Sequence, residues 1–167
     1  ISVGTTINGL IGADILSQFD IIINSDACRI ILSDEELPIY GDTLPFETFM
    51  GIPIIDVVVF GAPLRMFFDT GAKLSYMNPE ISSQFPSAGN ENDFYPGVGE
   101  FTTQTFSLPI EIGNKAITLR VGTLPNILER TLMMANVDGI LGTAFLDLFT
   151  VVFSPRQKIM SIQERIS

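Results

Sequence analysis

The chain has 167 residues, a formal net charge of -10 and no histidine. Because it lacks an imidazole, the sequence excludes Ser-His-Asp and Cys-His catalytic sites, HExxH metalloproteases and histidine-containing zinc sites, and its negative charge argues against nucleic acid as a partner. Its apolar runs are interrupted by Asp56 and Asp147 and are too short to cross a bilayer, so we expect a soluble protein with a β-rich core, no membrane span, no metal site and no cofactor.

The first element in the chain is one copy of an internal repeat. Residues 7–32, "INGLIGADILSQFDIIINSDACRIIL", match residues 137–162, "VDGILGTAFLDLFTVVFSPRQKIMSI", at a constant spacing without a gap. Each copy predicts a short helix, a strand, a turn rich in turn-forming residues and a second strand. The identical positions are Gly9 and Gly139, Gly12 and Gly142, Leu16 and Leu146, and Phe19 and Phe149.

Residues 1–36 are therefore interpreted as the C-terminal remnant of a preceding lobe homologous to the one that follows. The chain begins with Ile1 rather than methionine, which favours a fragment or a processed product. The one cysteine, Cys28, is expected to be a small core residue, since unpaired cysteines are usually buried. Residues 33–45, "SDEELPIYGDTLP", are polar and acidic and contain Pro and Gly, which predicts a linker over residues 37–45 with Asp42 as a turn residue.

A β-rich lobe is predicted over residues 46–167. Residues 49–72 predict a strand, a turn at Gly-Ala-Pro 61–63 and a second strand that ends at an aspartate. Residues 93–125 predict a hairpin with a glycine-rich tip and then another strand beyond a turn at residues 113–115. The second copy of the repeat completes the lobe with one short helix and two strands.

Two motifs in this lobe carry a resemblance to a known family. "FFDTGA", residues 67–72, is followed about 70 residues later by "GILG", residues 139–142, with a glycine-rich hairpin between them. This combination resembles the aspartic peptidases of the retropepsin and pepsin type, and the match covers roughly residues 46–163. It implies an all-β, acid-protease (retropepsin-like) closed β-barrel lobe, with one short helix after the apolar-apolar-Gly motif.

The resemblance also implies roles for individual residues. Asp69 would be the catalytic acid and base, Thr70 would tie the loops of two lobes together, and Gly71, with Ala72 after it, would bring a backbone N–H to the carboxylate. Behind this loop would pack Ile140, Leu141 and Gly142, the last leaving room for a crossing strand. The hairpin would be a flap that closes over substrate, although it also fits an ordinary exposed turn; its residues are Tyr95, Gly97, Val98 and Gly99.

Peptide hydrolysis by carboxylates needs a second acid beside Asp69. One group must take a proton from water while another gives a proton to the carbonyl oxygen, and two carboxylates that share a proton do both. Asp42 lacks the apolar residues that precede Asp69, so the second aspartate would come from an upstream lobe or from a second chain in a homodimer. Lys73 departs from the family pattern, and a cation near the pair would lower the pKa of an aspartate.

The sequence leaves three interpretations open. The first is an aspartic endopeptidase lobe that acts on extended peptides or proteins, which would bind under the flap with strand-like hydrogen bonds. The second is a non-catalytic module for peptide binding or dimerisation, motivated by Lys73 and the absent second aspartate. In the third, residues 69–71 are only a capped turn between strands. The sequence indicates neither the compartment nor the cleavage specificity.

Overall fold

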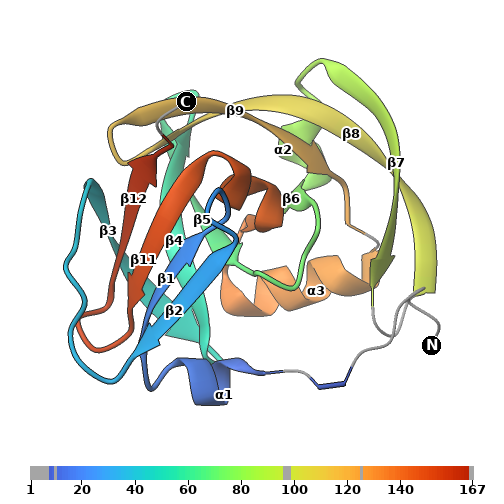
Figure 1. The fold of residues 1–167 in the computed structure, drawn as a ribbon. Helices are drawn as coiled ribbons and strands as arrows, with labels where there is room; N and C mark the ends of the chain where they lie inside the picture. The colour runs from blue at the N-terminus through green and yellow to red at the C-terminus, as the bar shows by residue number, and fades with distance from the viewer. Residues whose placement is uncertain (1–7, 10, 96–98, 125, 166–167) are drawn as a thin grey trace.

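A computed structural model describes residues 8–9, 11–95, 99–124 and 126–165. The molecule is mostly β-sheet, in agreement with the all-β class expected from the sequence (Figure 1). The strands are β1 (Asp20–Asn24), β2 (Arg29–Ser33), β3 (Asp42–Phe49), β4 (Ile52–Val59), β5 (Ala62–Phe68), β6 (Ser75–Met77), β7 (Ser87–Tyr95), β8 (Gly99–Ile112), β9 (Lys115–Gly122), β10 (Gly139–Leu141), β11 (Phe149–Ser154) and β12 (Ile159–Glu164). The helical segments are α1 (Ala13–Leu16), α2 (Pro79–Ser82), α3 (Asn126–Ala135) and the 3-10 helix η1 (Thr143–Asp147).

The strands follow one another by hydrogen bonding in the order β2-β1-β11-β12-β3-β4-β5-β10-β6-β9-β8-β7. An additional antiparallel pairing of Val58 on β4 with Glu111 on β8 closes part of this sheet into a ring. The main apolar cluster joins ring strands to η1, β11 and β12. Its fully buried members include Ile55, Leu108 and Phe145. The core thus depends on the second copy of the repeat as well as on the ring.

The β4–β5 hairpin turns one residue earlier than the sequence predicted. Phe60 and Gly61 both have positive φ, as the two central residues of a type I′ turn require. Ala62 and Pro63, which were expected to form the turn, instead begin β5, where Pro63 lies opposite Val58. The hairpin therefore has a two-residue turn at Phe60 and Gly61, and the Gly-Ala-Pro sequence does not form the turn as predicted.

Two other local predictions are wrong. Residues 42–45 lie in β3 rather than in a linker, because Leu44 is buried in the core and this half of β3 pairs with β12. Asp42 is consequently a strand residue and not a turn residue. Cys28 is exposed rather than buried, because it is the last residue of the β1–β2 turn and has a positive φ of 46°.

The lobe has more helix than the one short segment expected after "GILG". That segment is present as η1, but α2 and α3 were not predicted. In α3, Leu132 and Ala135 are buried while Met133 and Met134 are exposed, so one face packs on the core. Asn136, with positive φ, follows the last residue of α3, a common way for a helix to end. No helix in the described part of the chain is long and apolar enough to cross a membrane.

From the short helical segment onward, the two copies of the repeat have similar local structure. β2 begins at Arg29 and β12 at the equivalent residue Ile159, and the turns before them end in Cys28 and Lys158, which share a positive φ. β1 and β11 are antiparallel neighbours (Figure 1). Because the repeat copies are related by this pairing, β2-β1-β11-β12 forms a four-stranded unit with a local two-fold axis.

Candidate active site

Asp69 lies immediately after β5, where the chain leaves the sheet. Its backbone N–H donates to the carbonyl of Leu141 at 3.0 Å, which continues the parallel pairing of β5 with β10. Its carboxylate oxygen Oδ1 accepts a hydrogen bond of 2.8 Å from the N–H of Gly71. The side chain is half-buried. An oriented carboxylate is therefore open to solvent on one side.

The loop after Asp69 is held by the chain that follows β10. The N–H of Thr143 donates to the carbonyl of Ala72 at 2.8 Å, and the N–H of Gly142 donates to Ser75 Oγ at 3.1 Å. A side chain at Gly142 would collide with the carbonyl oxygens of Leu74 and Ala72. The two segments approach so closely that only glycine fits at this crossing.

Asp138, which the sequence reasoning missed, joins three segments beside this loop. Its Oδ2 accepts from the N–H of Arg65 at 2.8 Å, and its own N–H donates to the carbonyl of Arg65 at 2.8 Å. Its carbonyl accepts from the N–H of Asn78 at 2.9 Å. The signal in the sequence was an acid directly before the "GILG" motif. Asp138 thereby fixes the start of β10 between β5 and β6.

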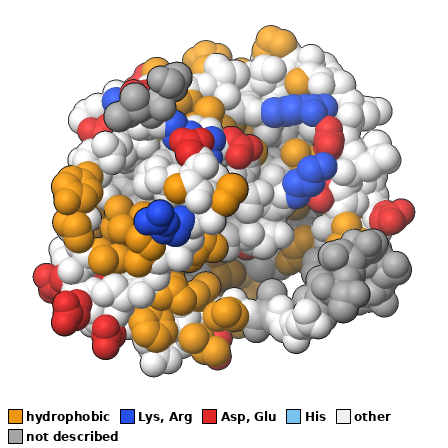
Figure 2. All heavy atoms as spheres, in the orientation of Figure 1, with side chains coloured by type: hydrophobic (Ala, Val, Ile, Leu, Met, Phe, Trp, Pro, Cys, Tyr) orange, Lys and Arg blue, Asp and Glu red, His pale blue; other side chains and the backbone are white. Residues whose placement is uncertain are grey.

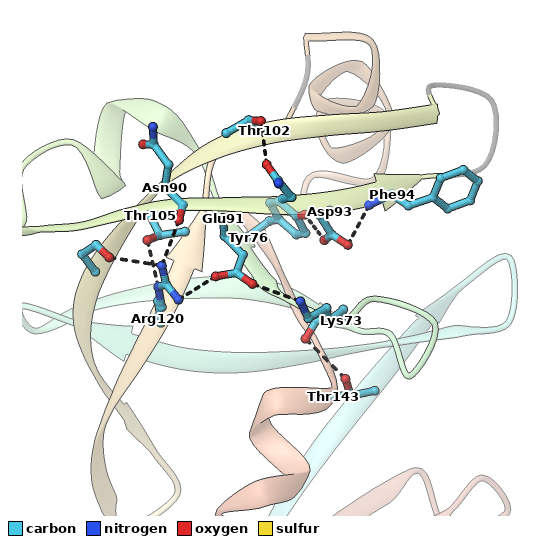
Figure 3. A network of polar contacts seen from close by, with 12 residues as sticks. Lys73, Tyr76, Asn90, Glu91, Asp93, Phe94, Thr102, Thr105, Arg120 and Thr143 are labelled. Carbon is cyan, nitrogen blue, oxygen red and sulfur yellow. Dashed lines mark hydrogen bonds and ion pairs between the residues drawn. The ribbon is translucent and has the colours of Figure 1, made fainter. Parts of the chain in front are cut away.

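Lys73 contacts the β7–β8 hairpin and not the Asp69 carboxylate. Its Nζ lies 3.0 Å from Oε1 of Glu91 on β7, and Glu91 Oε2 lies 2.8 Å from Nη1 of Arg120 on β9 (Figure 3). Arg120 also donates from Nε to Thr105 Oγ1 at 2.9 Å. The hydrogen bond from Lys73 lowers the pKa of Glu91 below its usual value, and the positive charges of Lys73 and Arg120 lower it further. This ion-pair network links the Asp69 loop, β7 and β9.

A second contact joins β6 to the same hairpin. The hydroxyl of the buried Tyr76 donates to Oδ2 of Asp93, and Oδ1 of Asp93 accepts from the N–H of Phe94 at 2.8 Å (Figure 3). Burial raises the pKa of Tyr76 above its usual value of 10, and the hydrogen bond to Asp93 and the charge of that carboxylate raise it further. The tyrosine therefore stays a neutral donor over the physiological range.

An open cavity of about 470 Å³ lies along the β7–β8 hairpin and reaches Lys73, and Asp69 is not among the residues that line it. Of the predicted flap residues, Tyr95 ends β7 and is exposed, and Gly99 begins β8 opposite it. Gly97 and Val98 lie outside the described residues. The cavity is lined by residues that the sequence reasoning did not select as a group: Lys73, Asn92, Asp93, Phe94, Glu100, Phe101 and Thr102.

The geometry brings some predicted residues together and leaves others apart. Asp69, Gly71 and Ala72 lie against Leu141, Gly142 and Thr143, while Thr70 is exposed. Among the described residues, Gly71 is the one hydrogen-bond donor to the Asp69 side chain, and no cluster of His, Cys, Asp and Glu suited to a metal is found there. No known protein family and no curated protein matches this chain.

Proposed function

We propose that this chain is a lobe of an aspartic endopeptidase with a retropepsin-like barrel fold. The observation that carries the proposal is the Asp69 loop. A half-exposed carboxylate, oriented by the N–H of Gly71, is held on a loop that β10 and the close crossing at Gly142 brace from behind. A carboxylate that exchanges protons with a substrate must be held in a fixed geometry, and these contacts hold Asp69 in this way.

The chemistry would need a second carboxylate facing Asp69. One carboxylate would take a proton from the attacking water while the other, protonated, would hydrogen-bond to the scissile carbonyl. Two such groups a few ångström apart share one proton, because both cannot be ionised together. The second aspartate comes from a second lobe or from a second copy of the chain. An extended peptide would lie between the Asp69 loop and the β7–β8 hairpin.

The direct test is cleavage of unstructured peptides between acidic and neutral pH. It uses the chain itself and a tandem protein, in which a copy of residues 37–136 replaces residues 1–6, so that the added lobe precedes residue 7 as the original precedes residue 137. We expect Asp69→Asn, introduced in every copy, to abolish cleavage, and a pepstatin-like transition-state mimic to block it. Asp147→Asn, at an exposed acid of η1, is the matched control. Cleavage by a pure sample that survives Asp69→Asn would contradict the proposal.

A non-catalytic peptide-binding or dimerisation module is the alternative. The Lys73–Glu91 ion pair favours it, because this pair connects the chain just after the Asp69 loop to the hairpin, and Lys73 lines the cavity. A module of this kind would bind extended peptides without cutting them. Fluorescence anisotropy of a labelled peptide library, followed by mass spectrometry of the same samples, separates the two functions. Binding with intact peptides favours the alternative, and cleavage dependent on Asp69 excludes it.

A further inference from the structure

Strand β7 lies at an edge of the sheet, so side-chain contacts decide how firmly it is held to the rest of the molecule. Within the described residues, β7 pairs only with β8. Glu91 lies opposite Thr103 of β8, and Asp93, two residues along the strand, projects to the same face as Glu91. Because Thr103 is buried, this face of the hairpin is turned toward the body of the protein.

Two basic side chains from different parts of the chain hold Glu91. Lys73 lies between β5 and β6, and its Nζ is 3.0 Å from Glu91 Oε1. Arg120 lies on β9, and its Nη1 is 2.8 Å from Glu91 Oε2. Each carboxylate oxygen thus contacts a different cation, and the three residues connect β7 both to β9 and to the chain that follows Asp69 (Figure 3).

The two cations are not fixed equally well. Arg120 has contacts that do not involve Glu91. Its Nε donates to Thr105 Oγ1 at 2.9 Å, and its Nη2 donates to the carbonyl of Ala88 at 3.1 Å. Lys73 Nζ, in contrast, has Glu91 as its one hydrogen-bond partner among the described residues, and 64% of the lysine side chain is exposed. Loss of the Glu91 charge would therefore leave Arg120 in place and release Lys73.

A bulge near the start of β7 gives the hairpin a point about which it can bend. The register of β7 against β8 shifts between Ser87 and Asn90, and Gly89 has a positive φ of 83°. A bulge of this kind bends a strand locally. The carbonyl of Gly89 accepts from Thr105 Oγ1 at 2.8 Å, which holds the bulge against β8. Glu91 lies two residues beyond this point, on the arm of the hairpin that leads to its tip.

The charged network is at the surface, where solvent protons reach it. In the region where Figure 1 draws β7 and β8, Figure 2 shows basic side chains on both sides of an acidic one. Among the described residues, Lys73 and Arg120 are the charged groups in contact with Glu91, and β8 places a threonine opposite it. Asp93, on the same face of β7, accepts from the hydroxyl of Tyr76 on β6. A hydroxyl can donate to a neutral carboxyl as well as to a carboxylate, so this second contact persists in acid.

We propose that Lys73, Glu91 and Arg120 form an acid-sensitive clasp, which ties the β7–β8 hairpin to the chain after Asp69 and opens when Glu91 takes up a proton. The hydrogen bond and the charge of Lys73, together with the charge of Arg120, lower the pKa of Glu91. The clasp is therefore closed at neutral pH and opens as the pH falls through this lowered value. Opening leaves Lys73 as an unpaired cation on the wall of the cavity that it lines. The clasp goes beyond the proposed function, and only its effect on the access of peptides to Asp69 rests on that function.

Amide hydrogen exchange of the 167-residue chain measures whether the clasp holds the hairpin. At neutral pH, Lys73→Met should raise the exchange rate of residues 87–95 by about twofold to fivefold, the range expected when an exposed ion pair is lost. Lys73→Arg keeps the charge and should exchange like wild type. Lys115→Met is the matched control, because Lys115 forms an ion pair of 3.2 Å with Glu164 that joins β9 to β12. It should leave the exchange of residues 87–95 unchanged.

Exchange in acid tests the protonation step. After correction for intrinsic exchange rates, wild type should lose protection at residues 87–95 in strong acid and become equal to Lys73→Met. Glu91→Gln should resemble Lys73→Met at neutral pH. If the chain unfolds in strong acid, about 1 M salt at neutral pH gives the same comparison, because salt screens an exposed ion pair. Equal protection of wild type and Lys73→Met at neutral pH, or a difference that persists in strong acid or in high salt, would overturn the proposal.

The outcome for the clasp is independent of the outcome for catalysis. In a chain that carries Asp69→Asn, the substitution Lys73→Met should have the same effect on the exchange of residues 87–95. If this effect is found and no peptide is cut, the clasp stands and the peptidase proposal fails. If Lys73→Met has no effect on exchange and the chain cuts peptides through Asp69, the clasp alone fails.

Discussion

Lys73 lies four residues after Asp69, and its ammonium nitrogen is 3.0 Å from the carboxylate of Glu91. The sequence had suggested that this lysine acts on the catalytic acid. Instead it reaches the hairpin that would cover the substrate, and Arg120 holds the same glutamate from the other side. The side chain of Lys73 is mostly exposed, so the ion pair contributes little to global stability. Its effect is to couple the position of the loop to that of the hairpin.

Glu91→Gln should make the melting temperature less dependent on pH in the acid range. The pKa of Glu91 is lowered in the folded protein, so its contribution is present above the unfolded value of about 4.5 and is lost as the pH falls through the lower folded value. Wild type should therefore melt higher than Glu91→Gln near neutral pH and equal to it in strong acid. Calorimetry across this pH range measures the difference in melting temperature, with Glu111→Gln at an exposed site as control. A difference that persists in strong acid contradicts the prediction.

Much of the fold follows from short-range patterns in the sequence. The constant spacing of the repeat identified two units whose helix, strands and turn coincide in the structure, and alternation of apolar residues identified the hairpins. Asp42 was misplaced because β3 is stabilised by β12, which lies near the other end of the chain, and not by its own neighbours. The turn at Phe60 was missed because Phe is not a typical turn residue.

The candidate site was less predictable, because its contacts join distant segments. Asp69 and the "GILG" motif could be recognised, but Glu91 and Arg120 carry no motif. Glu91 meets Arg120 because β7 and β9 flank β8 in the sheet, and it meets Lys73 from a distant part of the chain. The sequence also could not predict which apolar residues are exposed. Ile30 and Met160 are equivalent in the repeat, but Met160 is buried because residues of the β-rich lobe cover it, while Ile30 is exposed.

Gly142→Ala should destabilise the protein by about 2 kcal/mol or more, because the new methyl group would meet backbone carbonyls of residues 72 and 74, which cannot move without breaking the loop. Its repeat equivalent provides a matched control. A methyl group at Gly12 would meet only the flexible side chain of Asp14, so Gly12→Ala should be nearly neutral. Urea denaturation of both variants gives the comparison, and equal losses would contradict the role of the close crossing.

Tyr76→Phe should cost about 1.5 kcal/mol at neutral pH, because Asp93 loses a hydrogen-bond donor in a partly buried place. The pKa of Tyr76 is raised in the folded state, so its contribution is complete below about pH 10 and declines as the pH rises above that value. The difference in the free energy of unfolding between wild type and Tyr76→Phe should therefore become smaller at alkaline pH. Urea titrations at neutral and alkaline pH test this, with the exposed Tyr40→Phe as control; a constant gap contradicts the assignment.

Asp20→Ala should destabilise the chain by about 3 kcal/mol, because this carboxylate is fully buried and connects both repeat copies. It accepts hydrogen bonds from the N–H of Leu37 at 3.0 Å and from Ser154 Oγ at 2.9 Å, and Arg156 Nε lies 3.4 Å away. Asp147→Ala removes an exposed carboxylate and serves as control. Denaturant unfolding should give a lower free energy of unfolding for Asp20→Ala than for Asp147→Ala. A decrease of less than about 1 kcal/mol for Asp20→Ala would show that water replaces these contacts.

The dependence of cleavage on protein concentration distinguishes the two sources of the second aspartate. If a second lobe supplies it, the tandem protein should have a specific activity that does not change with concentration, and the 167-residue chain should be inactive. Asp69→Asn in either lobe of the tandem protein should then reduce kcat/KM by at least about 10³-fold, because one carboxylate cannot act as both acid and base.

If a second copy of the chain supplies the second aspartate, the specific activity of the 167-residue chain should rise with concentration. Mixing that chain with an equal amount of its Asp69→Asn variant would then leave about one quarter of the dimers with two aspartates. Initial rates over a wide range of protein concentration decide between these results.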